Sequence, residues 1–239
     1  MRSTPLHLPL AIALAAAPGA VRAAPRTFAL DPAASSLVAL TKPAGLLSGM
    51  SHPHVVVARA PRGTVVHDAE APEADRVEVE VDAGALEVDA PADRARHGLA
   101  AGLSEGDRKE ILAKMRSAEQ LDVARYPTIT FASTAVRAGA QGHVELTGTL
   151  TLHGRTVEVS LPVAVKVEGS TLRASGSLRI GHAPFGLKPI SLALGAIRNA
   201  EEILLRIDLV AREVGSAGPA PAASEPATPG PAAPTGPGP

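Results

Sequence analysis

The chain has 239 residues, a formal net charge of −1 and no cysteine. Its Lys and Arg residues are interspersed with acidic ones, which argues against nucleic acid as a partner, because phosphate binding needs clustered positive charge. Aromatic residues make up only 2% of the chain, too few for the surfaces on which bases or sugar rings stack. Because no disulfide framework is available, the folded part must rely on its core.

The N-terminus has the features of a secretory signal peptide. Arg2 is followed by an apolar run over residues 6–17 and then by the small residues of a cleavage site that ends at Ala23. The run contains Pro9, is followed by Pro18, and is shorter than the roughly 20 apolar residues that a membrane-spanning helix requires. The sequence therefore predicts cleavage after Ala23 and export to the periplasm or the medium, with no stable membrane span.

Alternating apolar and polar residues predict half-buried strands in the first part of the chain. Between Arg76 and Asp82, three valines occupy one face and three acidic residues occupy the other. Similar, shorter patterns predict strands over residues 28–30, 37–41, 54–60 and 63–67.

A helix is predicted at one place. Ser104, followed three residues later by Asp107, resembles a capping box, in which each side chain accepts a hydrogen bond from the other residue's backbone amide. Ile111 and Met115 then lie on one stripe at helical spacing. We therefore expect one short helix over residues 105–116.

The most regular pattern, in residues 144–167, predicts a tight β-hairpin. Apolar residues occupy even-numbered positions before His153-Gly154 and odd-numbered positions after it. A two-residue turn there brings both apolar sides onto one face, because Gly readily adopts positive φ and His tolerates it. The predicted pairs are Leu152 with Arg155, Leu150 with Val157, Leu146 with Leu161, and Val144 with Val163. His153 thus has a structural explanation before any chemical one.

The remaining patterns predict strands over residues 128–136, 172–180, 189–194 and 203–210, and from these segments we expect a barrel of about eight strands. Many short strands with little helix favour an antiparallel barrel, since closure removes exposed strand edges. The absence of Trp and of paired Cys argues against an immunoglobulin-type sandwich. The predicted fold class is therefore all-β, an antiparallel β-barrel with one short helix.

The composition divides the chain into three regions. The signal peptide covers residues 1–23, and one domain covers residues 24–214. Residues 215–239 are nearly all Ala, Pro, Gly, Ser and Thr, which bury too little apolar surface to order a segment. We expect this tail to be a disordered extension.

Three stretches of the chain together resemble one family. They are LDVARYPTITFAS from Leu121, LTGTLTLHGRTVEVSLPV from Leu146, and HAPFGLKPISLALGAIRNAEEILLRIDLVA from His182. Over about residues 28–212 the chain resembles the YceI-like family of exported polyisoprenoid-binding proteins. The resemblance implies an extended, lipocalin-like barrel whose interior is a long apolar tunnel for an isoprenoid chain or a related amphiphile.

The inward-facing positions of this register are the candidate ligand-binding residues. They are Ile129, Phe131, Leu146, Leu150, Val157, Leu161, Val163 and Leu178. Phe185 is added from a less regular segment. For each of them ordinary core packing is the alternative, since periodicity does not distinguish a filled barrel from a hollow one.

Arg125 and Tyr126, in the LDVARYP motif, are two further ligand-binding candidates. Pro127 restricts Tyr126 to an extended conformation, which predicts a structural corner. At a tunnel mouth, Tyr126 would cap the opening and Arg125 would meet an anionic head group.

No motif for covalent chemistry is readable, whether a nucleophile elbow, a phosphate loop or an acid pair. We therefore expect neither an enzyme nor a cofactor. His52 and His54 project to the same side of an extended segment, a spacing that suits a metal, although no third ligand is visible nearby. Some members of the resembled family have Gly-His-Asp-His here, from which Ser51 and Pro53 depart, and a loop at the barrel rim is the alternative interpretation.

These observations predict a periplasmic, non-catalytic carrier or buffer of an isoprenoid or similar lipid. Two alternatives stay open. One is a packed barrel that acts in envelope stress or protein interaction through its Pro-rich tail. The other is a secreted metal-binding protein that uses His52 and His54.

Overall fold

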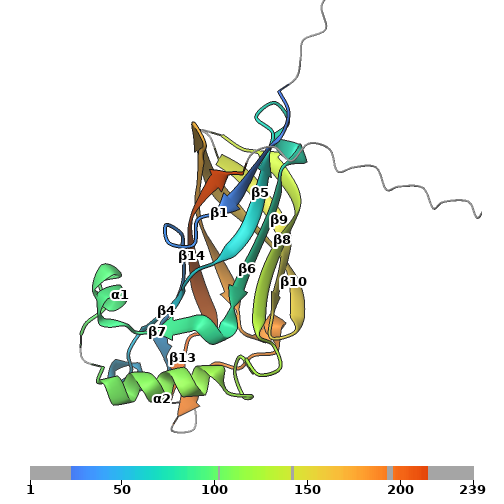
Figure 1. Cartoon of the computed structure of the whole chain (residues 1–239). Helices are drawn as coiled ribbons and strands as arrows, with labels where there is room; N and C mark the ends of the chain where they lie inside the picture. The colour runs from blue at the N-terminus through green and yellow to red at the C-terminus, as the bar shows by residue number, and fades with distance from the viewer. Residues whose placement is uncertain (1–22, 102, 141–142, 193–195, 215–239) are drawn as a thin grey trace, which may run out of the picture.

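Eight antiparallel strands close into a barrel in the computed structural model, which describes residues 23–101, 103–140, 143–192 and 196–214 (Figure 1). Their order around the barrel is β1-β5-β6-β8-β9-β10-β11-β14, and β14 pairs with β1 to complete the ring. They span Arg26–Leu30 (β1), Arg62–His67 (β5), Arg76–Asp82 (β6), Thr128–Ala138 (β8), His143–Leu152 (β9), Arg155–Glu168 (β10), Thr171–Gly181 (β11) and Glu202–Glu213 (β14). The predicted fold class is confirmed. The predicted signal peptide, apart from Ala23, and the predicted tail lie outside the described residues.

The sheet widens at one end of the barrel because β14 has two neighbours along the same edge. The C-terminal part of β14 pairs with β1, and its N-terminal half pairs with β2 (Ser36–Thr41). From β2 the sheet continues through β4 (His54–Ala58) to β7 (Leu86–Val88). These added strands lie toward the lower end of the molecule in Figure 1, where they extend the wall beyond the closed ring.

Short elements gather at the same lower end. A small separate sheet contains β12 (Ser191–Leu192), β13 (Ile197–Asn199) and β3 (Pro43–Ala44). The α-helices of the described residues are α1 (Pro91–Arg96) and α2 (Glu105–Arg116). The 3-10 turns η1 (Ser48–Met50), η3 (Ala83–Ala85) and η4 (Ala183–Phe185) lie at this end as well, whereas η2 (Pro72–Ala74) lies between β5 and β6 at the upper end. Helix α2 runs beneath β7 (Figure 1).

The β9–β10 hairpin has the register that the sequence predicts. Leu150 pairs with Val157, Leu146 with Leu161, and the other predicted pairs are present as well. His153 and Gly154 form the turn with φ angles of 52° and 68°, which are the positive values that a two-residue hairpin turn requires at both positions. The prediction that His153 is a turn residue is therefore confirmed.

The predicted helix forms as α2, with the predicted capping box. The Asp107 amide donates to Ser104 Oγ at 3.1 Å, and the Ser104 amide donates to Asp107 Oδ2 at 3.0 Å. The six-residue helix α1 is an addition that the sequence pattern did not indicate. In the part of the chain that the structure describes, no helix is both long and apolar enough to span a membrane.

Two predicted strands are shorter than expected. The strand predicted over residues 54–60 ends at Ala58, since Ala60 has a φ of 52° and Pro61 has no amide hydrogen to donate to a neighbouring strand. The strand predicted over residues 189–194 is present only as β12, and residues 193–195 lie outside the described chain.

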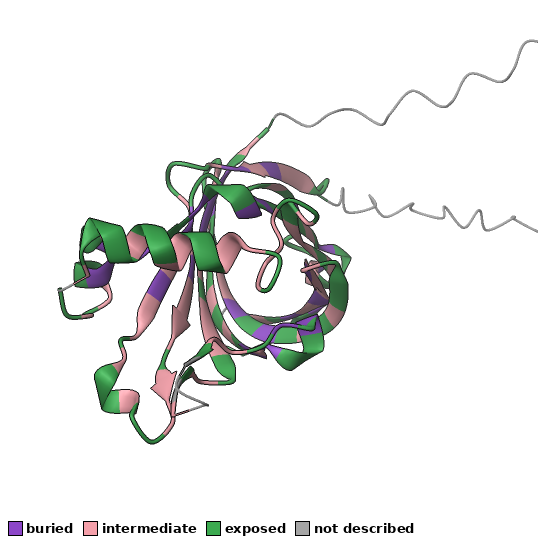
Figure 2. Cartoon of the chain, turned by 90° about the horizontal axis from the view of Figure 1, so that it is seen from below, coloured by how far each residue is buried: buried purple, intermediate pink, exposed green. Residues whose placement is uncertain are grey.

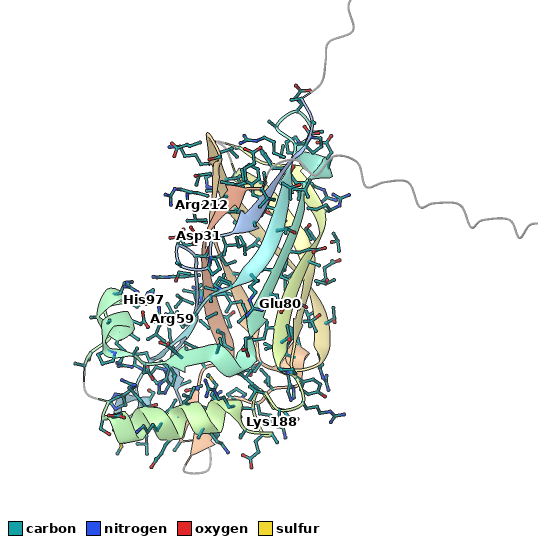
Figure 3. All side chains as sticks on the ribbon, in the orientation of Figure 1. Asp31, Arg59, Glu80, His97, Lys188 and Arg212 are labelled. Carbon is teal, nitrogen blue, oxygen red and sulfur yellow. The ribbon has the colours of Figure 1, made fainter. Side chains whose placement is uncertain are left out.

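The upper end of the barrel is closed by packed apolar side chains. They are Phe28, Leu30, Val65, Leu172, Leu209 and Ala211, all buried. Outside the barrel, two ion pairs join the first and last strands of the ring. Arg212 Nε donates to Asp31 Oδ2 at 2.9 Å just after β1, where the two side chains lie side by side in Figure 3, and Arg26 Nε donates to Glu213 Oε1 at 2.9 Å.

Candidate functional site

The barrel encloses an apolar cavity of about 650 Å³. Its wall consists of alternate residues of successive strands, because neighbouring side chains on a strand point to opposite faces. On two adjacent strands, for example, these residues are Val159, Leu161, Val163 and Val165 of β10, and Leu172, Ala174, Leu178 and Ile180 of β11. The interior is thus hollow and is not filled by side chains.

The cavity reaches the surface at the lower end of the barrel. We call this end the mouth and define it by the lining residues Ser51, His54, Glu110, Lys114 and Arg198. Glu110, Lys114 and Arg198 are exposed to solvent, so the cavity is open here, whereas the upper end is sealed by buried residues. Figure 2 looks at the molecule from this side and shows α2 exposed along most of its length next to the ring of strands.

Seven of the eleven predicted site residues line the cavity. They are Ile129, Phe131, Leu146, Leu150, Leu161, Val163 and Leu178. Val157 and Phe185 are not in the lining and pack instead in an apolar cluster beside the mouth, with Leu152 and Leu187. Contact of any of these residues with a ligand stays a prediction.

Arg125 and Tyr126 lie apart from the cavity, against the β9–β10 turn. The Tyr126 ring meets His153 edge-on at a centroid distance of 5.1 Å, and the Arg125 guanidinium lies 5.3 Å from the centre of the Tyr126 ring. A side chain at position 154 would overlap this ring, because a Cβ built on Gly154 comes within 2.3 Å of Tyr126 Cε1. The structure therefore supports the predicted corner and gives neither residue a place in the cavity lining.

His54 is fixed at the mouth by a buried carboxylate. Its Nδ1 lies 2.6 Å from Asp89 Oδ2, while Asp89 Oδ1 accepts hydrogen bonds from Arg94 Nη1 at 2.7 Å and from the Val55 amide at 3.0 Å. The Asp89 side chain is fully buried. Burial opposes ionisation, but the hydrogen bonds from His54, Val55 and Arg94 outweigh it, so the pKa of the Asp89 carboxyl lies below its ordinary value.

The two histidines of the predicted metal site have different surroundings. His54 is engaged by Asp89, whereas His52 is exposed. Among the described residues there is no group of three His, Cys, Asp or Glu side chains that would hold a metal ion. The sequence suggested that His54 binds a metal together with His52. In the structure, the partner of His54 is the Asp89 carboxylate.

The sequence pattern did not single out three residues that shape the mouth. Asp89 and Arg94 hold His54, and Thr41 pairs directly with it across β2 and β4. Asp89 contacts His54 over 35 positions in sequence, and no local periodicity signals such a contact. Two α2 residues, Ile111 and Met115, also line the cavity. Their helical spacing in the sequence indicated that α2 has an apolar face.

A family model described as a YceI-like domain matches residues 28–211. A UPF0312 protein from Pseudomonas savastanoi is 33% identical over 107 residues, which cover 45% of this chain and 46% of that protein. Protein YceI from Salmonella arizonae is 32% identical over the same length and the same shares. The chain thus spans about half the length of these curated relatives.

Solved structures share the fold at lower identity. BcnA from Burkholderia cenocepacia has a TM-score of 0.58 and 22% identity, covering 76% of this chain and 98% of that one. A domain from Saccharophagus degradans, described as polyisoprenoid binding, has a TM-score of 0.51 and 14% identity, covering 78% of this chain and 98% of that one. The structural likeness concerns the fold alone. Because the family model spans well over half of its residues, the chain belongs to the YceI-like family.

Proposed function

We propose that the protein binds a long-chain isoprenoid, or a similar amphiphilic lipid, reversibly in the barrel cavity and without a chemical step. The observation that carries this proposal is one apolar cavity that extends from the mouth to the sealed upper end and is walled by aliphatic side chains. The likeness to the Saccharophagus degradans domain described as polyisoprenoid binding supports the same ligand class. In this role the protein is a carrier or buffer.

Burial of prenyl carbons supplies the affinity. Each buried methylene contributes about 0.8 kcal/mol, so a five-carbon isoprene unit contributes on the order of 4 kcal/mol. Association costs about 4–15 kcal/mol in lost freedom of motion. A few units therefore suffice for binding without any charged contact in the barrel, and the protein should discriminate ligands by chain length.

The proposal places this activity in the periplasm. Its support is the signal-peptide pattern that ends at Ala23. If the pattern acts as a signal, the protein recovered from the periplasm has Ala24 at its N-terminus. N-terminal sequencing tests this, and an intact Met1 on the recovered protein would contradict it.

Protein purified gently from its own cells should carry a lipid. Native mass spectrometry is expected to show a species heavier than the polypeptide by the mass of one lipid, and solvent extraction should release a prenyl compound. The reason is that an empty apolar cavity of this size leaves much apolar surface uncovered. A mass equal to the bare polypeptide would count heavily against the proposal.

Filling the cavity from the middle of β11 should abolish lipid binding. Ala174 lines the cavity and packs against apolar clusters on both sides of it, so Ala174→Phe places a ring in the ligand's path. We expect the lipid-bound fraction in native mass spectra to fall at least about tenfold, because a blocked cavity can no longer bury several of the ligand's isoprene units. The control is Ser175→Phe, which puts the same ring on the exposed face of the strand. Equal lipid content in the two variants would contradict the assignment of the cavity as the binding site.

A further inference from the structure

His54 presents one ring nitrogen to the mouth of the cavity. It begins β4, where His54, Val56 and Ala58 alternate on the cavity side and Val55 and Val57 pack on the other face. The side chain of His54 is 19% exposed, whereas that of Asp89, behind it, is 0% exposed. Within the described chain, Nδ1 is the only ring nitrogen of His54 with a hydrogen-bond partner. The edge that carries Nε2 is therefore the free edge of the ring.

The buried partners of His54 determine what Nε2 can do. An ionised carboxylate only accepts hydrogen bonds, so Nδ1 must carry the hydrogen that it shares with Asp89. In the neutral imidazole Nε2 is then an acceptor. Arg94 pairs with the other oxygen of Asp89 and also donates to the Pro53 and Ala100 carbonyl oxygens, so the carboxylate already has a cationic partner.

A second polar residue, Thr41, is the cross-strand neighbour of His54. The two residues pair in the β2–β4 ladder, and both line the cavity. The Thr41 hydroxyl is buried and has no hydrogen-bond partner among the described residues. A buried hydroxyl without a partner is unfavourable, because it has lost its hydrogen bonds to water. The mouth thus combines an acceptor with a hydroxyl that can donate, at the end of an otherwise apolar cavity.

We infer that His54 Nε2, oriented by Asp89 and Arg94 and assisted by the Thr41 hydroxyl, is an anchor for a hydroxyl-bearing head group, such as that of a prenyl alcohol or a phenol. This inference rests on the proposed function, because the chain that it orients is the lipid in the cavity. The ligand hydroxyl donates to Nε2, and its oxygen accepts from Thr41. The anchor thereby fixes the direction of the lipid, with the chain in the barrel and the head group at the mouth.

An uncharged head group suits this site better than an anionic one. Asp89 brings a negative charge within 2.6 Å of the ring, and its neutralisation by Arg94 leaves no net positive charge at the anchor. The two cations among the mouth residues, Lys114 and Arg198, are both exposed to solvent. An ion pair with an exposed side chain contributes little.

Two ligands that differ by one hydrogen-bond donor test the anchor. Geranylgeraniol carries a hydroxyl at the end of its chain, and its methyl ether has the same chain without the donor. Binding of each to the purified protein after removal of endogenous lipid is measured by fluorescence competition. We expect the alcohol to bind about three- to tenfold more tightly than the ether, the range that one net hydrogen bond supplies.

The deciding variant is His54→Asn. The Asn amide nitrogen can still donate to Asp89, so the buried ion pair keeps its partner while Nε2 is removed. The alcohol is expected to lose its preference in this variant, and the affinity for the ether should stay the same. A preference retained in His54→Asn would overturn the anchor. A chemical shift of His54 Nε2 that moves on addition of the alcohol, but not of the ether, would support direct contact.

The other outcomes separate the anchor from the proposed function. If the wild type binds alcohol and ether equally, the anchor is wrong and lipid binding stands. If neither ligand binds while the protein is folded, the proposed function fails and the anchor fails with it. Geranylgeranyl monophosphate tests whether the site prefers an anion. If it binds more tightly than the alcohol, and this preference is lost in His54→Asn, the mouth is an anion site and the inference is overturned.

Discussion

Replacing Leu161 with Glu is expected to lower the free energy of unfolding by at least about 4 kcal/mol. Leu161 is 3% exposed and lies on the cavity face of β10, opposite Leu146. The substitution removes a buried leucine, which costs about 2–5 kcal/mol when the side chain is truncated. It also places a carboxyl group among aliphatic side chains, with a further cost unless it is protonated. Urea unfolding followed by circular dichroism measures the loss.

The neighbouring residue supplies the control. Ser160 lies on the same strand with its side chain on the exposed outer face, where Glu158 is already tolerated. Ser160→Glu loses a surface hydrogen bond with Thr147 and is expected to cost less than about 1 kcal/mol. If both variants were similarly stable, the inward face that defines the cavity would be assigned to the wrong set of residues.

The faces of the long strands were predictable because the information is local. In β9 and β10 the apolar residues repeat every second position, and the His153-Gly154 turn fixes how the two strands meet. Once the register is known, the side that holds Leu146 and Leu161 must be the inside of a closed sheet. This is why the predicted residues of these two strands that line the cavity include Leu146, Leu150, Leu161 and Val163.

Closure and the shape of the mouth depend on contacts between distant residues. The ring closes where Phe28 pairs with Glu213, and no pattern within either strand specifies that partner. The short strands β3, β7 and β13 have two or three residues, which is too few for a period to be recognised. The hollow interior was equally unreadable, since inward valines and leucines look the same in a packed barrel and in an open one.

The sequence pattern did not reveal the carboxylate partner of His54 for a related reason. His54 was singled out for its spacing from His52, a feature that suggests a metal. Its partner in the structure is Asp89, which has a φ of 51° after β7 and reaches back across the sheet. An Asp before Ala-Pro at the start of a helix is typical of a turn or cap residue. The local sequence therefore does not indicate the tertiary contact of Asp89 with His54.

Removing the Asp89 charge should be among the most destabilising single changes at the mouth. Asp89→Asn keeps the shape of the side chain but leaves Arg94 as a buried cation without a counter-ion, since the Arg94 side chain is 5% exposed. Loss of one partner of a buried pair costs about 3–5 kcal/mol, measurable by chemical denaturation at pH 7. The double variant Asp89→Asn/Arg94→Met should be more stable than Asp89→Asn alone, because neither charge remains. Asp31→Asn, which breaks the largely exposed pair with Arg212, should have a much smaller effect.

The pH dependence provides an independent check on the same carboxylate. Burial works against ionisation of Asp89, but its hydrogen bonds prevail, and its pKa is lower in the folded than in the unfolded chain. The unfolded chain therefore takes up the proton first as the pH falls, so the stabilisation is fully present above about pH 4, the ordinary range of an Asp side chain, and is lost through the lower folded-state value. The stability difference between wild type and Asp89→Asn should accordingly shrink as the pH falls below about 4. A difference that stayed constant down to pH 2 would mean that ionisation of Asp89 does not stabilise the fold, and His54 would then lack the ionised partner that orients its ring.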